Sequence, residues 1–146
     1  MPDAAYAASS AAIRAFDDVT VAQKNFAGQN LQQAEFNDAR LEGADFSHAD
    51  LRGAVFNAAI LKQANLEGVN MSDGLAYLSN FGGANLSDGV FQGALLLKST
   101  FRDAVVTGAD FSDAVLDKEQ VIELCKSASG VNSMTGVETR ESLGCP

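Results

Sequence analysis

The chain has 146 residues, a formal net charge of −9 and a sequence pI of about 4.4. This length fits one domain, and the acidic balance argues against binding to a phosphate backbone, which requires a basic surface. No stretch approaches the roughly 20 apolar residues that span a bilayer, so we expect neither a nucleic-acid partner nor insertion into a membrane.

Residues 1–18 show no regular period, and we interpret them as an N-terminal cap or flexible segment. The Ala-rich stretch at 4–15 is expected to form a short helix that places Ile13 and Phe16 over the open first coil of the repeat that follows, because the end of a solenoid needs a cap. No basic-then-apolar signal peptide is visible, which fits a processed chain.

Residues 19–116 follow a period of five. Nearly every fifth residue from Val21 to Leu116 is Leu or Phe; a small residue, most often Ala, precedes it by two positions, and Gly or Asp often follows it by two. A helix has a period near 3.6 and a strand a period of 2, so neither explains the pattern. The period is explained if each unit forms one side and one corner of a square coil, with one large and one small side chain pointing inward.

Two segments, ADFSHADLRGA at 44–54 and GADFSDAVL at 108–116, carry the pattern Ala-(Asp/Asn)-(Leu/Phe)-X-X. They resemble the pentapeptide-repeat family. The resemblance implies an all-β solenoid, a right-handed quadrilateral β-helix of about five coils with a helical C-terminal cap.

The phenylalanines change sides along this solenoid. Residues 61–80 contain no Phe, and we interpret this stretch as an aliphatic layer between two arrangements of Phe on different pairs of sides. The stretch at 73–80 fits the repeat worst, because Ala76 is too small for the large inward position. Either the chain bulges here or its apolar residues remain outside.

Residues 117–146 no longer follow the period and are interpreted as an α-helical C-terminal cap. Asp117 and Gln120 have the spacing of a capping box, and Gly130 is expected to end the helix. A second short helix is expected around 135–143. The apolar stripe of the first helix should cover the open end of the last coil, and it consists of Val121, Ile122, Leu124 and Cys125.

The two cysteines, Cys125 and Cys145, lie on this cap and on the tail. The residues alone leave two alternatives, a pair of reduced thiols or a disulfide that pins the tail to the cap. A disulfide closing a loop of this length would stabilise the fold by about 3 kcal/mol and would indicate an oxidising compartment.

The tail at 124–146 resembles the C-terminal cap of the thylakoid-lumen pentapeptide-repeat proteins of cyanobacteria and chloroplasts, in which a Thr-Arg-Glu-Ser-Leu segment precedes the last Cys, as at 139–143. This resemblance implies a Cys125–Cys145 disulfide and a location in the thylakoid lumen, or the periplasm, rather than the cytoplasm. It implies no established activity.

The sequence predicts neither an enzyme nor a bound metal or cofactor. Its one histidine, His48, falls at a predicted exposed corner, and a zinc site needs three or four ligands. The glycines follow the period of five, so no phosphate-binding loop is predicted.

Two adjacent sides of the predicted solenoid carry many acidic residues, such as Asp45, Asp50 and Asp110. We interpret them as a solvated surface; the alternative, suggested by resemblance to the gyrase-protecting pentapeptide proteins, is an acidic DNA-mimic that binds a type II topoisomerase.

The fourth side has apolar residues at outward positions where the other sides carry polar ones: Val55, Leu75, Tyr77, Leu78, Leu95, Leu97 and Val115. Stacked coils would align them into one stripe, and a contiguous exposed apolar patch often marks an interface. The alternative is that the 73–80 segment and the tail cover them. We therefore predict a non-enzymatic structural or protein-interaction module with an unknown protein partner, present as a monomer or weak homo-oligomer.

Overall fold

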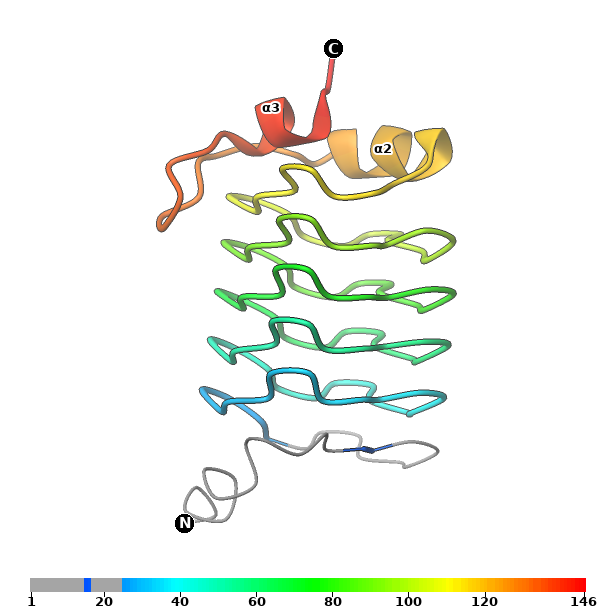
Figure 1. Cartoon of the computed structure of the whole chain (residues 1–146). Coiled ribbons are helices and arrows are strands. Elements are labelled where there is room, and N and C mark those ends of the chain that lie inside the picture. Colours follow the sequence, from blue (N-terminus) through cyan, green and yellow to red (C-terminus); the bar gives the residue numbers. More distant parts are fainter. Residues whose placement is uncertain (1–14, 17–24) are drawn as a thin grey trace.

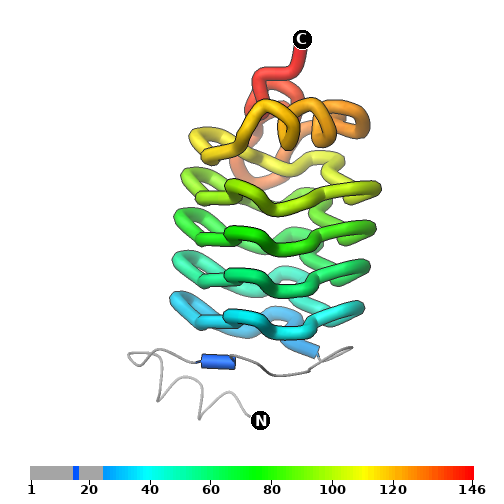
Figure 2. The backbone as a smooth tube through the Cα atoms, turned by 90° about the vertical axis from the view of Figure 1, so that its right-hand side faces the viewer, coloured from blue at the N-terminus to red at the C-terminus, as the bar shows by residue number. Residues whose placement is uncertain are grey.

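The computed structural model describes residues 15–16 and 25–146. Along them, every fifth residue forms a parallel bridge with the residue 20 positions later, as Asn25 does with Asp45 and Asn30 with Asp50. Each coil therefore contains 20 residues and four sides, as the period predicted. The coils stack into a column with two helices at its C-terminal end (Figure 1), and each coil is seen as a separate layer after a 90° turn (Figure 2).

The pairing between coils consists of isolated bridges; among the described residues no longer strand forms. A side is too short for one, because a corner follows within two residues of each central position. Most units still donate two amide hydrogen bonds to the next coil, as Leu51 N does to Asn70 O (2.7 Å) and Gly53 N to Ser72 O (3.0 Å). Paired hydrogen bonds of this kind hold the coils together, with exceptions at Leu78 and at the last coil.

Each corner is a tight turn with a left-handed residue. Ala34 N donates to Leu31 O (3.1 Å) across such a turn, and Gln33, inside it, has a φ of 61°. A positive φ at the third residue is the mark of a type II turn, which favours glycine. The Gly or Asp expected two positions after each large residue occupies this place, with φ of 70° at Gly43 and 59° at Asp38.

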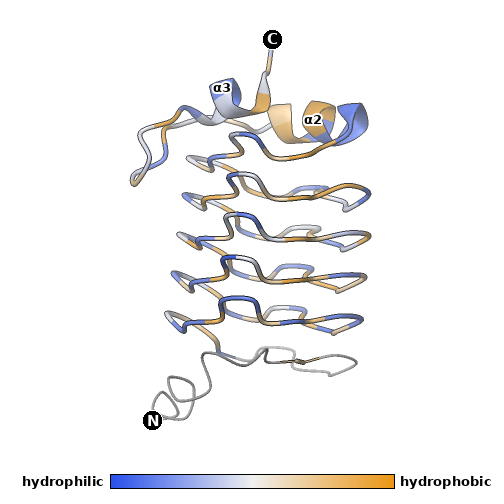
Figure 3. Cartoon of the chain, viewed as in Figure 1, coloured by the Kyte–Doolittle hydropathy of each residue, from blue (hydrophilic) through white to orange (hydrophobic). Residues whose placement is uncertain are grey.

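The large and small inward residues form one continuous core, and apolar and polar residues alternate along every coil (Figure 3). Phe rings stack between successive coils on one pair of sides in the first half and on the other pair in the second half, as predicted. The stacked pairs, with their centroid separations, are Phe26–Phe46 (4.9 Å), Phe36–Phe56 (4.7 Å), Phe81–Phe101 (5.1 Å) and Phe91–Phe111 (5.1 Å).

Glycine replaces alanine at two small positions in the part of the core where the phenylalanines change sides. A Cβ atom on Gly74 would lie 2.7 Å from Met71 Cγ, and one on Gly89 would lie 2.7 Å from Phe91 Cε2. The space left by the missing methyl groups is taken by the longer side chains. Close packing is thereby maintained across the transition.

The segment at 73–80 keeps the register of the repeat. Leu75 pairs with both Val55 and Leu95, and Ala76 occupies the large inward position with no exposed surface. Of the two alternatives, the structure adopts the one in which the apolar residues stay outside: Tyr77 and Leu78 are exposed.

The repeat begins earlier than expected. Ala15 pairs with Glu35, and Phe16 N donates to Glu35 O at 2.6 Å. The Phe16 ring stacks on Phe36 at 4.7 Å. The proposed boundary after residue 18 was therefore wrong, because Phe16 lies 20 residues before Phe36 and extends its column. The expected helix at 4–15 and the capping role of Ile13 lie outside the described residues, apart from Ala15, which is in a bridge.

The C-terminal cap contains α2 (Lys118–Cys125) and α3 (Thr139–Leu143). Asp117 and Gln120 form the predicted capping box. However, α2 ends at Cys125 rather than near Gly130, and its buried residues are Gln120 and Leu124. Ile122, expected in the buried stripe, is 54% exposed. The reason is that the rim of the last coil presents carbonyl oxygens, which a glutamine can satisfy and an isoleucine cannot.

The Cys125–Cys145 disulfide joins the last residue of α2 to the residue directly after Gly144, the C-cap of α3. The connecting loop also lies against the coils. Asn132, which is 1% exposed, donates from Nδ2 to Gly89 O (3.2 Å) and Gly108 O (2.9 Å). The tail is therefore fixed both covalently and by hydrogen bonds.

Candidate functional site

The predicted partner residues lie together on the fourth side, whose central residues are Phe36, Phe56, Ala76, Leu96 and Leu116. Four of them stack directly, since consecutive bridges join Val55 to Leu75, Leu75 to Leu95, and Leu95 to Val115. Together with the remaining three, they form what we call the apolar stripe: Val55, Leu75, Tyr77, Leu78, Leu95, Leu97 and Val115.

Most of the apolar stripe is open to solvent. Leu78 is 57% exposed, Leu95 46% and Tyr77 45%, whereas Val55 and Leu75 are half-buried. The cap and the 73–80 segment, as far as the chain is described, leave these side chains uncovered. A contiguous exposed apolar patch often marks an interaction site.

The corner that follows the fourth side also departs from the repeat. It consists of Asp38, Ala58, Leu78 and Lys98, all with positive φ and none of them glycine. Leu78, with φ of 59°, is the bulkiest apolar residue in this conformation, which costs a non-glycine residue about 1–2 kcal/mol. Its amide N–H makes no hydrogen bond to any described residue, whereas Ala58 N, one coil earlier, donates to Tyr77 O at 2.8 Å. Strain of this kind is concentrated at functional surfaces.

Beneath the stripe runs a buried ladder of hydroxyl groups that the sequence analysis missed. Ser79 and Ser99 occupy small inward positions and are 1% and 2% exposed. Ser79 Oγ donates to Phe56 O, Ser99 Oγ to Ala76 O (2.6 Å), and Gln120 Nε2 to Leu96 O (2.6 Å). The backbone under the strained corner is therefore fixed in place. Serine is as acceptable as alanine at the small inward position of the repeat. The only sequence signal for this ladder was therefore the interruption of the run of Ala at that position.

Several acidic residues serve turns on the two adjacent acidic sides, the second (centred on Phe26, Phe46 and Leu66) and the third (centred on Leu31, Leu51 and Met71). Oδ1 of Asp45 accepts from Ser47 N (2.9 Å) and Oδ1 of Asp110 from Ser112 N (2.9 Å), a role that Asn65 fills toward Glu67 N (3.0 Å). Asn and Asp are therefore interchangeable at this position for a local structural reason. The carboxylates of Asp45 and Asp110 are thus used within their own turns.

Asp50 also forms an ion pair. The Arg52 guanidinium donates to its carboxylate at 2.8 and 2.6 Å. This hydrogen bond is the main reason that the pKa of Asp50 is lowered below its ordinary value. The pair is exposed, so it contributes little to stability.

The one histidine of the chain is not part of a metal-binding cluster of described residues. His48 is exposed at a corner, with φ of 59°, and lies over Gly68, where an added Cβ would be 2.4 Å from Nδ1. No cluster of three or more His, Cys, Asp or Glu side chains capable of holding a metal occurs in residues 15–16 and 25–146. Neither α2 nor α3, the helices of that part, has the length and hydropathy to cross a bilayer.

Comparisons with known proteins agree with this architecture. The pentapeptide-repeat family profile matches in eight copies over residues 25–57, 34–73 and 79–117. Two proteins of Arabidopsis thaliana match in sequence. Thylakoid lumenal protein TL20.3 is 62% identical over 42 residues, 29% of this chain, and thylakoid lumenal 15 kDa protein 1 is 47% identical over 47 residues, 32% of this chain. The matched parts are only 15% and 21% of those relatives' own lengths.

Among solved structures, a pentapeptide repeat protein from the thylakoid lumen of Arabidopsis thaliana is 36% identical, with a TM-score of 0.85 over 87% of this chain and 88% of that one. A pentapeptide repeat protein from Nostoc, 21% identical, has a TM-score of 0.63 over 76% and 91% of the two chains and shows the same fold. From the profile match and the similarity to the lumen protein, the chain belongs to the pentapeptide-repeat family.

Proposed function

We propose that this chain is a right-handed quadrilateral β-helix that works as a non-enzymatic protein-interaction module, with the apolar stripe as its docking surface. The observation that carries the proposal is the coincidence of the stripe with the strained corner. Leu78 is exposed, apolar and held at positive φ, although glycine would fit this position better. Polar residues such as Gln33 and His48 adopt this conformation at the other corners, but Leu78 is the bulky apolar residue that does so in the described part of the chain. An exposed leucine held in this conformation is best explained by a contact with another molecule.

The edge of the stripe defines the chemistry of the partner. Asp73 and Asp113 lie at the corner that precedes the fourth side, next to Leu75 and Val115 along the chain, and both are exposed. Neither forms an ion pair with a described residue. We therefore propose a partner that presents an apolar patch bordered by Lys or Arg side chains. A second copy fits less well, because each copy carries a net charge of −9.

We place the protein in the thylakoid lumen. The proteins that it resembles carry that location in their names, and the Cys125–Cys145 disulfide fits an oxidising compartment. The periplasm has the same redox character and is the other compartment that these features fit. The acidic DNA-mimic is not proposed, since Asp45, Asp50 and Asp110 are engaged by turn amides.

The test replaces two leucines of the stripe. Leu95→Ser with Leu97→Ser should reduce recovery of the partner, cross-linked and co-purified from the native compartment and identified by mass spectrometry, at least about tenfold, because two anchoring side chains are lost. Stability should change by less than about 1 kcal/mol, since both side chains are partly solvated.

Val105→Ser is the matched control. Val105 is 46% exposed, as is Leu95, but it lies on another side of the solenoid. Recovery unchanged by the double substitution, or reduced equally by the control, would refute the assignment of the stripe.

A further inference from the structure

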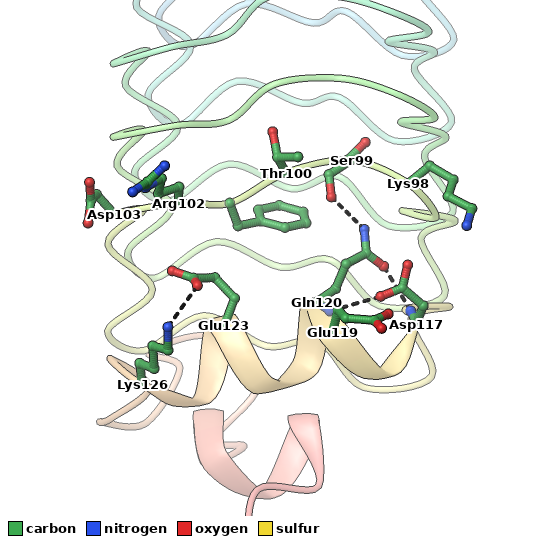
Figure 4. A pocket seen from close by; sticks show the side chains of 11 residues that line it. Lys98, Ser99, Thr100, Arg102, Asp103, Asp117, Glu119, Gln120, Glu123 and Lys126 are labelled. Carbon is green, nitrogen blue, oxygen red and sulfur yellow. Dashed lines mark hydrogen bonds and ion pairs between the residues drawn. The ribbon is translucent and has the colours of Figure 1, made fainter.

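A groove of about 680 Å³ separates the last coil from α2. We call it the edge groove; its coil wall is formed by residues 98–103 and its helix wall by Glu119, Gln120, Glu123 and Lys126. The side chains of Arg102 and Asp103 lie on one wall and those of Glu123 and Lys126 on the other, with open space between them (Figure 4). Phe101 also lines the groove. The groove lies on the first side, whose central residues are Leu41, Leu61, Phe81 and Phe101, around the corner from the apolar stripe.

The groove exists because the chain leaves the coil path early. In the lower coils of this side, two amides of each unit donate to the coil above. The bonds are Leu61 N to Asn80 O (2.7 Å), Gln63 N to Gly82 O (2.8 Å), Phe81 N to Thr100 O (2.8 Å) and Gly83 N to Arg102 O (2.8 Å). Residues 120 and 122 would accept the next two bonds, but they belong to α2, which passes over the core instead.

Two backbone donors are consequently left at the edge. The N–H groups of Phe101 and Asp103 donate to no atom of the described chain. The tail covers the equivalent edge on two other sides, where Gly108 N donates to Ser129 O (2.7 Å) and Phe111 N to Ser142 Oγ (3.0 Å). On each of the other sides one of the two edge amides is paired, as Leu96 N is with Val115 O (3.0 Å) on the fourth side. Among the described residues, the first side is thus the one on which both amides of an unpaired edge, which proteins generally protect, face a groove.

We propose that the edge groove binds an extended peptide segment of a partner protein, which adds one strand to the first side. Its backbone would offer two carbonyl oxygens, two residues apart, to Phe101 N and Asp103 N. The oxygens of Thr100 and Arg102 do this for Phe81 N and Gly83 N one coil below. An extended backbone is the group whose acceptors have this spacing.

Residues spaced 20 apart stack above one another on the first side, and these stacks indicate which side chains the bound segment should carry. The residue between the two carbonyls would point inward above Phe101, as Phe101 itself does above Phe81. It should be short and apolar to fit beside α2. The next residue would lie above Arg102, which has no ion pair among the described residues, and should be acidic. The one after it would lie above Asp103, where the alternation Gly43, Gln63, Gly83, Asp103 places a glycine. The groove therefore selects a sequence of the form polar–apolar–acidic–Gly.

The experiment uses the full-length, disulfide-bonded protein and amide signals in NMR spectra. Without ligand, the amides of Phe101 and Asp103 should exchange with solvent at least about 100-fold faster than those of Phe81 and Gly83. The peptide acetyl-Asn-Thr-Val-Glu-Gly-Asn-amide should then shift the two edge amides and slow their exchange at least about tenfold. Absence of both changes at millimolar peptide would overturn the proposal.

A charge exchange supplies the control. Arg102→Glu, at an exposed position, should weaken binding of this peptide about tenfold or more. A peptide with Lys in place of Glu should bind the variant as the original peptide binds the parent protein. Equal binding of both peptides by both proteins would contradict the inferred register. The pair Leu95→Ser and Leu97→Ser should leave the peptide-induced shifts unchanged, so this test is independent of the function proposed for the stripe.

Discussion

The four corners of the solenoid are built in two ways. At three of them a bulkier residue alternates with glycine from coil to coil, and the bulkier side chain lies over the glycine: His48 over Gly68, and Gln63 over Gly83. At the corner formed by Asp38, Ala58, Leu78 and Lys98 no glycine occurs, although every residue has the same left-handed conformation. At the first kind a non-glycine residue with positive φ occurs in every second coil. At the second it occurs in every described coil, and this corner borders the apolar stripe.

The chain also leaves the solenoid at the glycine-free corner, because Lys118, the first residue of α2, is the next position in its column. The disulfide ties the far end of that helix to the tail. Replacing both cysteines, Cys125→Ser with Cys145→Ser, should lower the free energy of unfolding by about 3 kcal/mol, because the open loop gains conformational entropy in the unfolded chain. Urea denaturation with and without reductant measures this: reductant should destabilise the parent protein equally and leave the variant unchanged. A parent protein insensitive to reduction would contradict it.

A glycine at one of the regular corners tests the other half of the comparison. Gly68→Ala should lower the free energy of unfolding by about 2–3 kcal/mol, since its φ is +67° and the new Cβ would meet the His48 ring. Gly28 has the same conformation, with φ of +70°, but no atom of the described residues lies within 4 Å of the Cβ that Gly28→Ala would add. This second substitution should cost only about 1–2 kcal/mol. Equal losses in thermal or urea unfolding would show that stacking across the corner does not matter.

Much of this architecture could be predicted from the sequence, because a period of five constrains every unit in the same way. The inward columns, the change of sides by Phe and the capping box all follow from residue type and spacing. The early start of the repeat was missed because the Leu-or-Phe rule fails on either side of Phe16, so one match stands alone.

What could not be predicted depends on how the ends are closed. Gln120 is buried and Ile122 exposed because the last coil ends in carbonyl oxygens, a fact that helical periodicity does not contain. The edge groove has the same origin: its open donors belong to Phe101 and Asp103, which look ordinary in the repeat. The apolar stripe, in contrast, was visible as a departure from the polar outward positions of the other sides.

Leu78→Gly tests whether the glycine-free corner is strained. The substitution should raise the free energy of unfolding by up to about 1 kcal/mol, because glycine adopts a φ of 59° without the clash of a Cβ atom. Leu95→Gly is the matched control, since Leu95 is also an exposed leucine of the stripe but is not among the residues with positive φ. It should lose stability. A loss at both positions in chemical denaturation would mean that Leu78 is not held at a cost.

The smallest expected effect concerns Asp110, which has no exposed surface and serves a regular turn. Burial disfavours its ionised form, but hydrogen bonds from the hydroxyl and amide of Ser112, with those from Thr135 and Gln92, outweigh it and lower the pKa of Asp110 below 3.8. A folded-state pKa below the unfolded value contributes stability that is present above about pH 4 and is lost as the pH falls through the folded-state pKa.

Asp110→Asn should remove this dependence. Asn70 occupies the same column two coils earlier and accepts from Ser72 N (3.1 Å), so an amide side chain can keep the turn bond without a titrating group. The variant should be close to the parent at pH 7 and should lose less stability between pH 4 and pH 2, both measured by urea denaturation. Parallel losses in the two proteins would mean that the Ser112, Thr135 and Gln92 contacts do not favour the carboxylate, and that the turn at Asp110 depends on hydrogen bonding alone, as it does at Asn70.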